Sequence, residues 1–357
     1  MTMASVRAQT LTLVAGGGTD VKVVGEKHYI VLRRGPLEAV IVDNSAVDDA
    51  VLPRHRGGYH GLASLKHTQQ QRNIFVPAYA GLNFEHIHDG TTQPREILFE
   101  PRFAPMELRA IDDHTAELHQ PPTPHWGLES WMRYQLLEDG VVEMRFACVP
   151  RRATWRNNFL GLFWANYIDQ PESLDIHFLA AAAENGWVRG TTPSHGVLAT
   201  HRAPNDDRQF AHDTDFPLSL VFNFSNHRYA EPWYFGACRG MALAQIFRRD
   251  DQVRFSQSPS GGGNGNPAWD FQYFISEPKV GQRYELVVLF ENKDRMDKFV
   301  AGGWDSSATA EAAAGKEGKA ARTTFYNGVA YYQITDKGLM AHADITGTKF
   351  WVNDDLR

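Results

Sequence analysis

Short runs of apolar residues, separated by polar turn residues, occur along most of this 357-residue chain. Residues 29–33 and 38–42 are rich in β-branched side chains and closely spaced. Longer runs follow at 131–137 and 141–149, and the Glu-Asp-Gly sequence at 138–140 between them is typical of a hairpin turn. Many short strands at this spacing are typical of a β sandwich or barrel, so the pattern predicts an all-β fold.

The strand-and-turn pattern extends along the whole chain, which predicts one β-sandwich domain over residues 1–357. Two segments depart from it. Residues 303–322 are rich in Ala and Gly and predict a short helix or a linker. Residues 323–357 return to β character, and we interpret them as a C-terminal β extension.

Two further segments lack the strand pattern and are rich in Gly and polar residues, namely 53–96 and 256–270. Irregular loops on a rigid β scaffold are where binding groups usually lie. These two segments are therefore expected to contain residues that carry chemistry.

The densest set of candidate residues is the sequence Asn83-Phe84-Glu85-His86-Ile87-His88-Asp89-Gly90. In an extended strand, His86 and His88 point to the same face. Such a pair suits three roles: ligands of a divalent metal, direct contacts to a substrate as acid and donor, or structural histidines. A metal site needs further ligands, and none stands at a characteristic spacing, so the three alternatives stay open.

A second set follows the Gly-rich run at 261–263 and contains Trp269, Asp270 and Gln272. In a strand, Asp270 and Gln272 share a face and Trp269 lies on the other one. A carboxylate beside an amide and an aromatic ring suits a sugar, because the ring stacks on the apolar face of a pyranose. The alternative is that Asp270 caps the Gly-rich loop through its backbone amides.

Other candidate substrate contacts are polar or aromatic residues in loops or in aromatic surroundings. They are His60, Arg72, Asn83, Arg156, Trp164, Asn166 and His195. For Asn166 the alternative is structural, because a buried amide needs hydrogen-bond partners and holds a loop by finding them.

Composition excludes several classes of partner. The net charge is −6 with a pI of about 6.2, and no basic stretch is long enough to follow a nucleic-acid backbone. No apolar run approaches the roughly 20 residues of a membrane span. Phosphate-binding loops, dinucleotide fingerprints and nucleophile elbows are also missing from the sequence.

The compartment and the oligomeric state stay open at this level. No intact signal peptide is recognisable, so a cytoplasmic protein and an exported one that has lost its leader are both compatible with the sequence. The two cysteines, Cys148 and Cys238, are predicted to be either two buried thiols or one disulfide bridge.

The order of these sequence features resembles the galactose-mutarotase (aldose 1-epimerase) superfamily. An early Asn…His-Gly-Gly segment of that family is similar to residues 83–90, and its late Glu-x-Gln segment is similar to Asp270-Phe271-Gln272. The Pro-Gly-Glu sequence and Tyr-led strand that follow in the family correspond to residues 278–290 here. The resemblance implies a large antiparallel β-supersandwich, a substrate-binding histidine near His86 and a general base at Asp270.

One departure concerns the central acid histidine of that family, which lies in an Asn-x-x-His-x-Tyr-Phe-Asn run. The similar run here, residues 163–167, contains aromatic residues and Asn166 but no histidine. The general acid of a mutarotase is therefore missing from its expected position.

Three functions follow from these sets of residues. The first is a carbohydrate-active enzyme that acts on a polysaccharide or oligosaccharide as a lyase or hydrolase, with His86, His88 and Asp270 as catalytic residues. The second is a mutarotase-like sugar epimerase, and the third is a non-catalytic carbohydrate-binding module. A carbohydrate is the partner in all three, and a divalent metal at His86 and His88 is the one cofactor under consideration.

Overall fold

The structure is a computed structural model of the chain. It describes residues 22–294, apart from 139, 182–185, 195–198, 218 and 263–264, and two short stretches at 334–335 and 338–339. The predicted site residue His195 and the predicted helix or linker at 303–322 lie outside the described residues.

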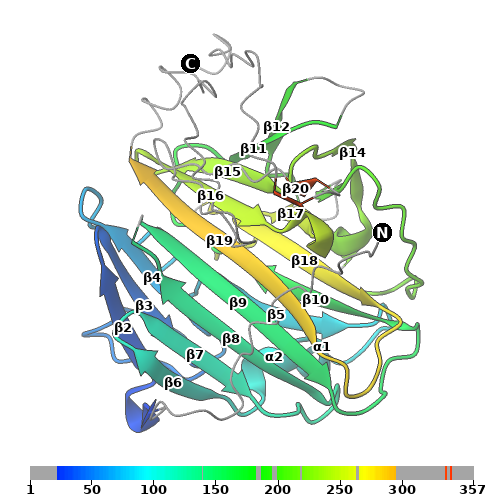
Figure 1. Cartoon of the computed structure of the whole chain (residues 1–357), viewed down its shortest axis with the longest axis horizontal. Coiled ribbons are helices and arrows are strands. Elements are labelled where there is room, and N and C mark those ends of the chain that lie inside the picture. Colours follow the sequence, from blue (N-terminus) through cyan, green and yellow to red (C-terminus); the bar gives the residue numbers. More distant parts are fainter. Residues whose placement is uncertain are drawn as a thin grey trace, which may run out of the picture.

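The fold is all-β and consists of large antiparallel sheets, as the sequence pattern predicts (Figure 1). The largest sheet has ten strands, in the order β1 (Lys22–Val23), β6 (Glu107–Asp112), β7 (Thr115–Gln120), β8 (Leu128–Leu136), β9 (Val141–Pro150), β19 (Tyr284–Asp294), β16 (Met241–Phe247), β15 (Trp233–Cys238), β11 (Asp175–Leu179) and β12 (Trp187–Thr191). The second sheet has six strands, in the order β14 (Phe224–Arg228), β13 (Thr200–Arg202), β17 (Arg254–Ser258), β18 (Ala268–Ser276), β10 (Phe159–Ala165) and β5 (Asn83–His88).

Two smaller sheets complete the β structure. A three-stranded sheet contains β2 (Tyr29–Arg34), β3 (Leu37–Val42) and β4 (Gly61–His67), and a two-stranded one contains β20 (Ile334–Thr335) and β21 (Gly338–Leu339). Every pairing between named strands is antiparallel except that of β13 with β14.

Strict alternation explains how the large sheet buries one face. Along β8, every second residue from Leu128 to Leu136 is buried, and the residues that alternate with them are only half-buried. Because successive side chains in a strand point to opposite faces, this alternation buries one face of β8 against the second sheet.

The main core lies between the ten-stranded and six-stranded sheets, which are stacked in Figure 1. Phe146 of β9 contacts both Phe84 of β5 and Trp164 of β10, with ring centroids 5.2 and 4.8 Å apart. Phe271 of β18 stacks on Trp164 from the other side, at 5.1 Å. These rings fill the space between the sheets and fix the register of β5, β10 and β18, the three strands that carry most of the candidate residues.

Among the described residues the helical segments are short, and their locations were not predicted. Two single-turn helices, α1 (Arg95–Leu98) and α2 (Glu100–Phe103), follow β5, and three 3-10 turns lie at η1 (Gly25–Lys27), η2 (Ser219–Phe222) and η3 (Arg249–Asp251). The segment 53–96, which lacks an obvious strand pattern, contains β4 and β5. Both strands are buried on both faces, so the polar and apolar positions do not alternate there.

Cys148 and Cys238 are both free and buried, so the disulfide alternative is wrong and the chain carries two buried thiols at these positions. Within the described part of the chain, no helix is both long enough and apolar enough to cross a bilayer.

Candidate functional site

The register of the six-stranded sheet places most of the predicted site residues on one face. His86 of β5 lies opposite Phe163 of β10, which lies opposite Gln272 of β18, which lies opposite Arg254 of β17. Residues directly opposite each other in a sheet point to the same side. Because Phe84, Trp164 and Phe271 point into the main core, the row from His86 to Arg254 points away from it. We call this second surface the polar face.

Two further rows on the polar face flank the first one. On one side Ala165 of β10 lies opposite Asn83 of β5, and Asp270 of β18 lies opposite Ser256 of β17. On the other side His88 lies opposite Gly161, which lies opposite Phe274. β10 lies between β5 and β18 and pairs with both. The two histidines of β5 and the Asp-x-Gln pair of β18 therefore lie on the same face of the sheet, one strand apart.

A β-bulge adds Glu85 to this face. Phe163 is opposite His86, yet the next residue of β10, Trp164, is opposite Phe84, so Glu85 is one extra residue in β5. A bulge of this kind re-aims the side chain of the extra residue. The carboxylate of Glu85 therefore lies beside His86, with its Oε2 3.4 Å from Nε2 of the imidazole.

Glu85 is buried and holds three polar partners. Besides His86, Tyr167 donates its hydroxyl to Oε1 at 2.7 Å, and Nη1 of Arg102 donates to the same oxygen at 3.2 Å. Burial alone would raise the pKa of Glu85, but the charges and hydrogen bonds of His86, Arg102 and Tyr167 outweigh it and lower the pKa. Glu85 is consequently ionised at neutral pH.

Asp270 has the opposite electrostatic environment. Its side chain is 2% exposed, and burial, together with the nearby charge of Glu85, raises its pKa well above the usual range. The opposing contributions are weaker: the backbone N–H of Asn166 donates to Oδ1 at 3.0 Å, and the hydroxyl of Ser258 lies 3.5 Å from Oδ2. Glu85 and Asp270 thus form a pair of buried carboxyl groups whose pKa values are shifted in opposite directions.

His88 lies in an apolar enclosure. Four phenyl rings surround it, with centroids between 5.1 and 6.2 Å from its own; they belong to Phe159, Phe216, Phe222 and Phe274. Burial, and to a lesser extent the charge of His86, lowers the pKa of His88 to about 3, so the ring is neutral at neutral pH. Gly161 makes room for it, because a Cβ there would lie 2.3 Å from Nε2 of His88.

The predicted metal site at His86 and His88 does not gain further ligands. Across the residues that the structure describes, no group of three or more His, Cys, Asp or Glu side chains is arranged to hold a metal ion. Phe99 and Phe163 pack against the ring of His86, with centroids 4.1 and 5.1 Å away. Phenyl rings therefore occupy the surroundings of both histidines, where a metal site would need more donors.

Several buried polar atoms on or beside the polar face have no hydrogen-bond partner within the described chain. They are both ring nitrogens of His60 and His88, both amide atoms of Asn83, Nδ1 of His86 and Oε1 of Gln272. Burial, with a contribution from Arg102, lowers the pKa of His60 to about 3. Buried polar groups are ordinarily paired, so a cluster of unpaired ones is a feature of sites that bind a polar ligand or ordered water.

Three other predicted substrate contacts point to the opposite face of the same strands. Trp164 and Trp269 are fully buried in the main core. Asn166 is fully buried as well, and its amide accepts from Leu82 N–H at 2.7 Å and donates to Trp269 C=O at 2.8 Å. Asn166 therefore holds the backbone around β5, β10 and β18 together, which is the structural alternative considered for it.

Two predicted arginines are not brought into the site. The guanidinium of Arg72 is 64% exposed and lies 3.9 Å from Asp169, and Arg156 is exposed, with its backbone N–H donating to Asp89. His195 lies outside the described residues. The residues that do converge are His60, Asn83, His86, His88, Asp270 and Gln272.

Sequence reasoning missed three residues of this site: Glu85, Arg102 and Tyr167. Glu85 lies between two residues that were considered, and strict strand alternation assigns it to the face opposite His86. The bulge moves Glu85 to the face of His86, and a bulge has no reliable signal in a single sequence. Arg102 and Tyr167 reach Glu85 from α2 and from the loop after β10, and tertiary contacts alone reveal them.

Partly exposed aromatic rings cover the polar face. Tyr59, Tyr79 and Tyr167 form one group, with centroids 4.3 to 5.7 Å apart, and Phe99 and Phe222 pack against the same small apolar cluster. Tyr59, Tyr79, Phe99 and Phe222 are half-buried, whereas the carboxyl groups below are buried. The site thus has a polar floor and an aromatic cover with accessible edges.

No protein-family model matches the sequence. Beta cell expansion factor A from Aeromonas veronii is 42% identical over 76 residues, which are 21% of this chain and 29% of that protein. The match thus spans less than a third of the length of this curated relative.

Solved structures give longer matches at low identity. The chain is similar to a galactose mutarotase related enzyme from Lactobacillus acidophilus, with 10% identity over 75% of this chain and 98% of that one, at a TM-score of 0.46. A galactose mutarotase-like protein from Lactobacillus casei matches with 11% identity over 74% and 99% of the two chains, at a TM-score of 0.43. Heparan sulfate lyase HepC from Pedobacter heparinus matches with 10% identity over 77% and 36%, at a TM-score of 0.40.

Proposed function

We propose that this chain is a carbohydrate-active enzyme that moves protons at the anomeric centre of a sugar, with Glu85 as general base and Asp270 as general acid. The observation that carries the proposal is the pair of buried carboxyl groups on one sheet face, one with a lowered pKa and one with a raised pKa. Environments that shift the pKa values of two titratable groups apart are how proteins assign an acid and a base.

Ring opening of a cyclic sugar uses one proton donor and one acceptor. Asp270 donates its proton to the ring oxygen while Glu85 takes the proton of the anomeric hydroxyl, and the bond between the anomeric carbon and the ring oxygen breaks. The open-chain aldehyde then closes on either face, the two protons return, and both anomers form with Glu85 ionised and Asp270 protonated again. Asp270 thereby acts as the general acid, the role of the central histidine that is absent from residues 163–167 of this chain.

Burial favours a small sugar over a polymer. Glu85 is 4% and Asp270 2% exposed. A site that binds a polysaccharide must be open at both ends so that the chain can extend beyond it, whereas a site for a free sugar can enclose its ligand completely. β5 and β18 are separated by β10, so their axes lie about 10 Å apart at the usual strand spacing. The half-buried Tyr59 and Tyr79 offer rings on which a pyranose stacks.

Anomer exchange followed by NMR on a panel of aldoses and uronic acids tests the proposal. We expect exchange to be faster than in buffer for at least one sugar, and Glu85→Gln and Asp270→Asn each to slow it by about 10²- to 10⁴-fold. Glu129→Gln, a carboxylate on the outer side of β8, is the matched control and should retain full activity.

Parallel assays separate the alternatives. Release of reducing ends, or of products with unsaturated uronate absorbance, from polysaccharides without any anomer exchange would replace the proposal by glycosidic bond cleavage. Sugar binding that persists in both carboxyl variants, with no turnover of any kind in the wild type, would assign the chain to non-catalytic binding modules.

A further inference from the structure

A surface segment, residues 203–217, lies over one end of the polar face; we call it the strap. It contains no helix or strand, and only Ala203, Asp206 and Phe216 of its residues are buried. Phe216 contacts His88, and Phe210 stacks on Phe274 at 4.5 Å. An irregular segment of this length that is held at a few points is typical of the lids that cover binding sites.

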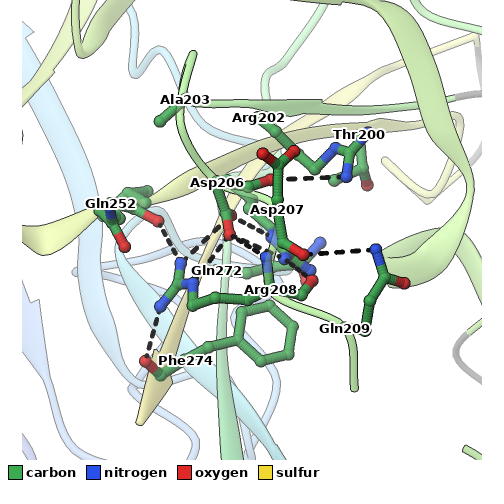
Figure 2. Close-up of polar contacts among 12 residues, drawn as sticks. Thr200, Arg202, Ala203, Asp206, Asp207, Arg208, Gln209, Gln252, Gln272 and Phe274 are labelled. Carbon is green, nitrogen blue, oxygen red and sulfur yellow. Dashed lines mark hydrogen bonds and ion pairs between the residues drawn. The ribbon is translucent and has the colours of Figure 1, made fainter. Parts of the chain in front are cut away.

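The deepest attachment of the strap is an ion pair between Asp206 and Arg254 of β17. Nε of Arg254 donates to Oδ2 at 2.7 Å and Nη2 to Oδ1 at 3.2 Å, and both side chains are completely buried. Arg208 of the strap binds the same carboxylate at 2.8 Å. Figure 2 shows Asp206 beside Arg208, whose guanidinium also donates to the backbone oxygens of Gln252 and Phe274.

Arg254 belongs to the row of the polar face that runs from His86 to Gln272. It is diagonal to Asp270, because Ser256 lies opposite Asp270 and Arg254 opposite Gln272, and diagonal neighbours in a sheet lie about 7–8 Å apart. Arg254 and the proposed acid Asp270 are therefore neighbours on the same face of the sheet.

The guanidinium of Arg254 still has unused donor capacity. Nη1 is buried without a hydrogen-bond partner in the described chain, and Oε1 of the neighbouring Gln272 is likewise unpaired. The rings of Phe274, Phe224 and Phe210 lie 4.6 to 5.1 Å from the guanidinium carbon. One carboxylate, that of Asp206, faces the two guanidinium groups of Arg208 and Arg254, so this end of the site carries an excess of positive charge.

We infer that Arg254 is the subsite for a carboxylate of the substrate, which is a sugar acid, and that Asp206 occupies this subsite while the strap is closed. A planar carboxylate bound by two nitrogens of one guanidinium is the geometry that a uronate would also adopt. A uronate bound there replaces Asp206, extends over Gln272 toward Asp270 and releases the strap. The inference rests on the proposed function, because it names the substrate class of that site.

Calorimetric titration with galacturonate, and with galactose as the neutral counterpart, measures this competition. We expect Asp206→Asn to bind galacturonate about tenfold more tightly than the wild type, because the internal competitor loses its charge. Asp207→Asn removes the neighbouring strap carboxylate, which is 81% exposed and pairs with Arg228, and should leave the affinity unchanged. Arg254→Gln should lower the ratio of galacturonate to galactose affinity by about tenfold or more.

Hydrogen–deuterium exchange on the wild-type protein gives a second readout that needs no variant to fold. Galacturonate should accelerate exchange of the amides in residues 203–217, whereas galactose and acetate at the same concentration should not. Protection of the strap by galacturonate, an equal effect of acetate, or equal affinities of Asp206→Asn and Asp207→Asn would overturn the inference. These two measurements need no turnover, so their outcome does not depend on the proposed function. If the protein exchanges the anomers of neutral aldoses but shows none of these effects, the inference is wrong and the proposed function is retained.

Discussion

The two faces of β5, β10 and β18 are built from the same strands and are both buried, yet they differ in the polar groups that they bury. On the core face, Trp164 stacks between Phe84 and Phe271, with centroids 4.8 and 5.1 Å away, and the amide of Asn166 is fully hydrogen-bonded. The polar atoms without a partner that these strands turn to this face in the described chain are the indole nitrogens of Trp164 and Trp269. On the polar face, unpaired nitrogens and amide atoms lie beside carboxyl groups with shifted pKa values.

The comparison of the two faces shows that burial alone does not identify a structural residue. Burying a polar group without a partner costs about 1–3 kcal/mol, so the unpaired imidazoles and amides of the polar face reduce the stability of the fold. A protein that keeps such a face gives up stability where a ligand is to be bound.

The largest effect is expected on the core face. Trp164→Ala removes a fully buried ring from between two others and should destabilise the protein by about 3–5 kcal/mol in urea unfolding. A loss below about 1 kcal/mol would show that the stacked rings are not the main attachment between the two sheets.

A pH-dependent effect is expected from His88 on the polar face. Its folded-state pKa of about 3 is lower than its ordinary value of 6.5, so between these values the unfolded chain binds the proton more readily. The stability that depends on the neutral ring is therefore complete above pH 6.5 and is lost as the pH falls toward 3.

His88→Leu removes this titration. The unfolding free energy of the wild type, relative to the variant, should fall by about 1.4 kcal/mol per pH unit below pH 6.5, or by about 2 kcal/mol at pH 5. Urea unfolding of both proteins across this range measures the difference, and parallel curves would mean that His88 is charged or solvated in the folded state.

Two buried asparagines give the smallest effects and the most direct contrast. Asn83 and Asn166 are both 0% exposed, but only Asn166 has partners for its amide. Leucine has the same branching as asparagine and no polar atoms. Asn83→Leu should stabilise the protein by about 1 kcal/mol, because it removes an unpaired amide, and should abolish sugar binding. Asn166→Leu should destabilise the protein by about 1–3 kcal/mol, because it leaves the backbone partners of the amide unpaired. Changes of the same sign in urea unfolding would contradict the distinction between the faces.

The sequence was sufficient for the fold class and for part of the site, for a physical reason. Alternation such as that of β8 depends on local burial, and the Asp-x-Gln spacing of β18 places Asp270 and Gln272 on one face in any strand. Which face that is depends on the register with β10 and β17, which is a tertiary property. Trp164, a candidate substrate contact, therefore lies on the core face, and Glu85 was missed because a bulge in β5 moves it to the side of His86.

The state of Asp270 at neutral pH tests the central claim most directly. An infrared difference spectrum between the wild type and Asp270→Asn reports whether the carboxyl group that is removed was protonated. We predict the loss of a carbonyl band of a protonated acid in Asp270→Asn, whereas Glu85→Gln should lose only carboxylate bands. Loss of carboxylate bands in Asp270→Asn would mean that both groups are ionised, and the polar face would then contain no acid to pair with its base.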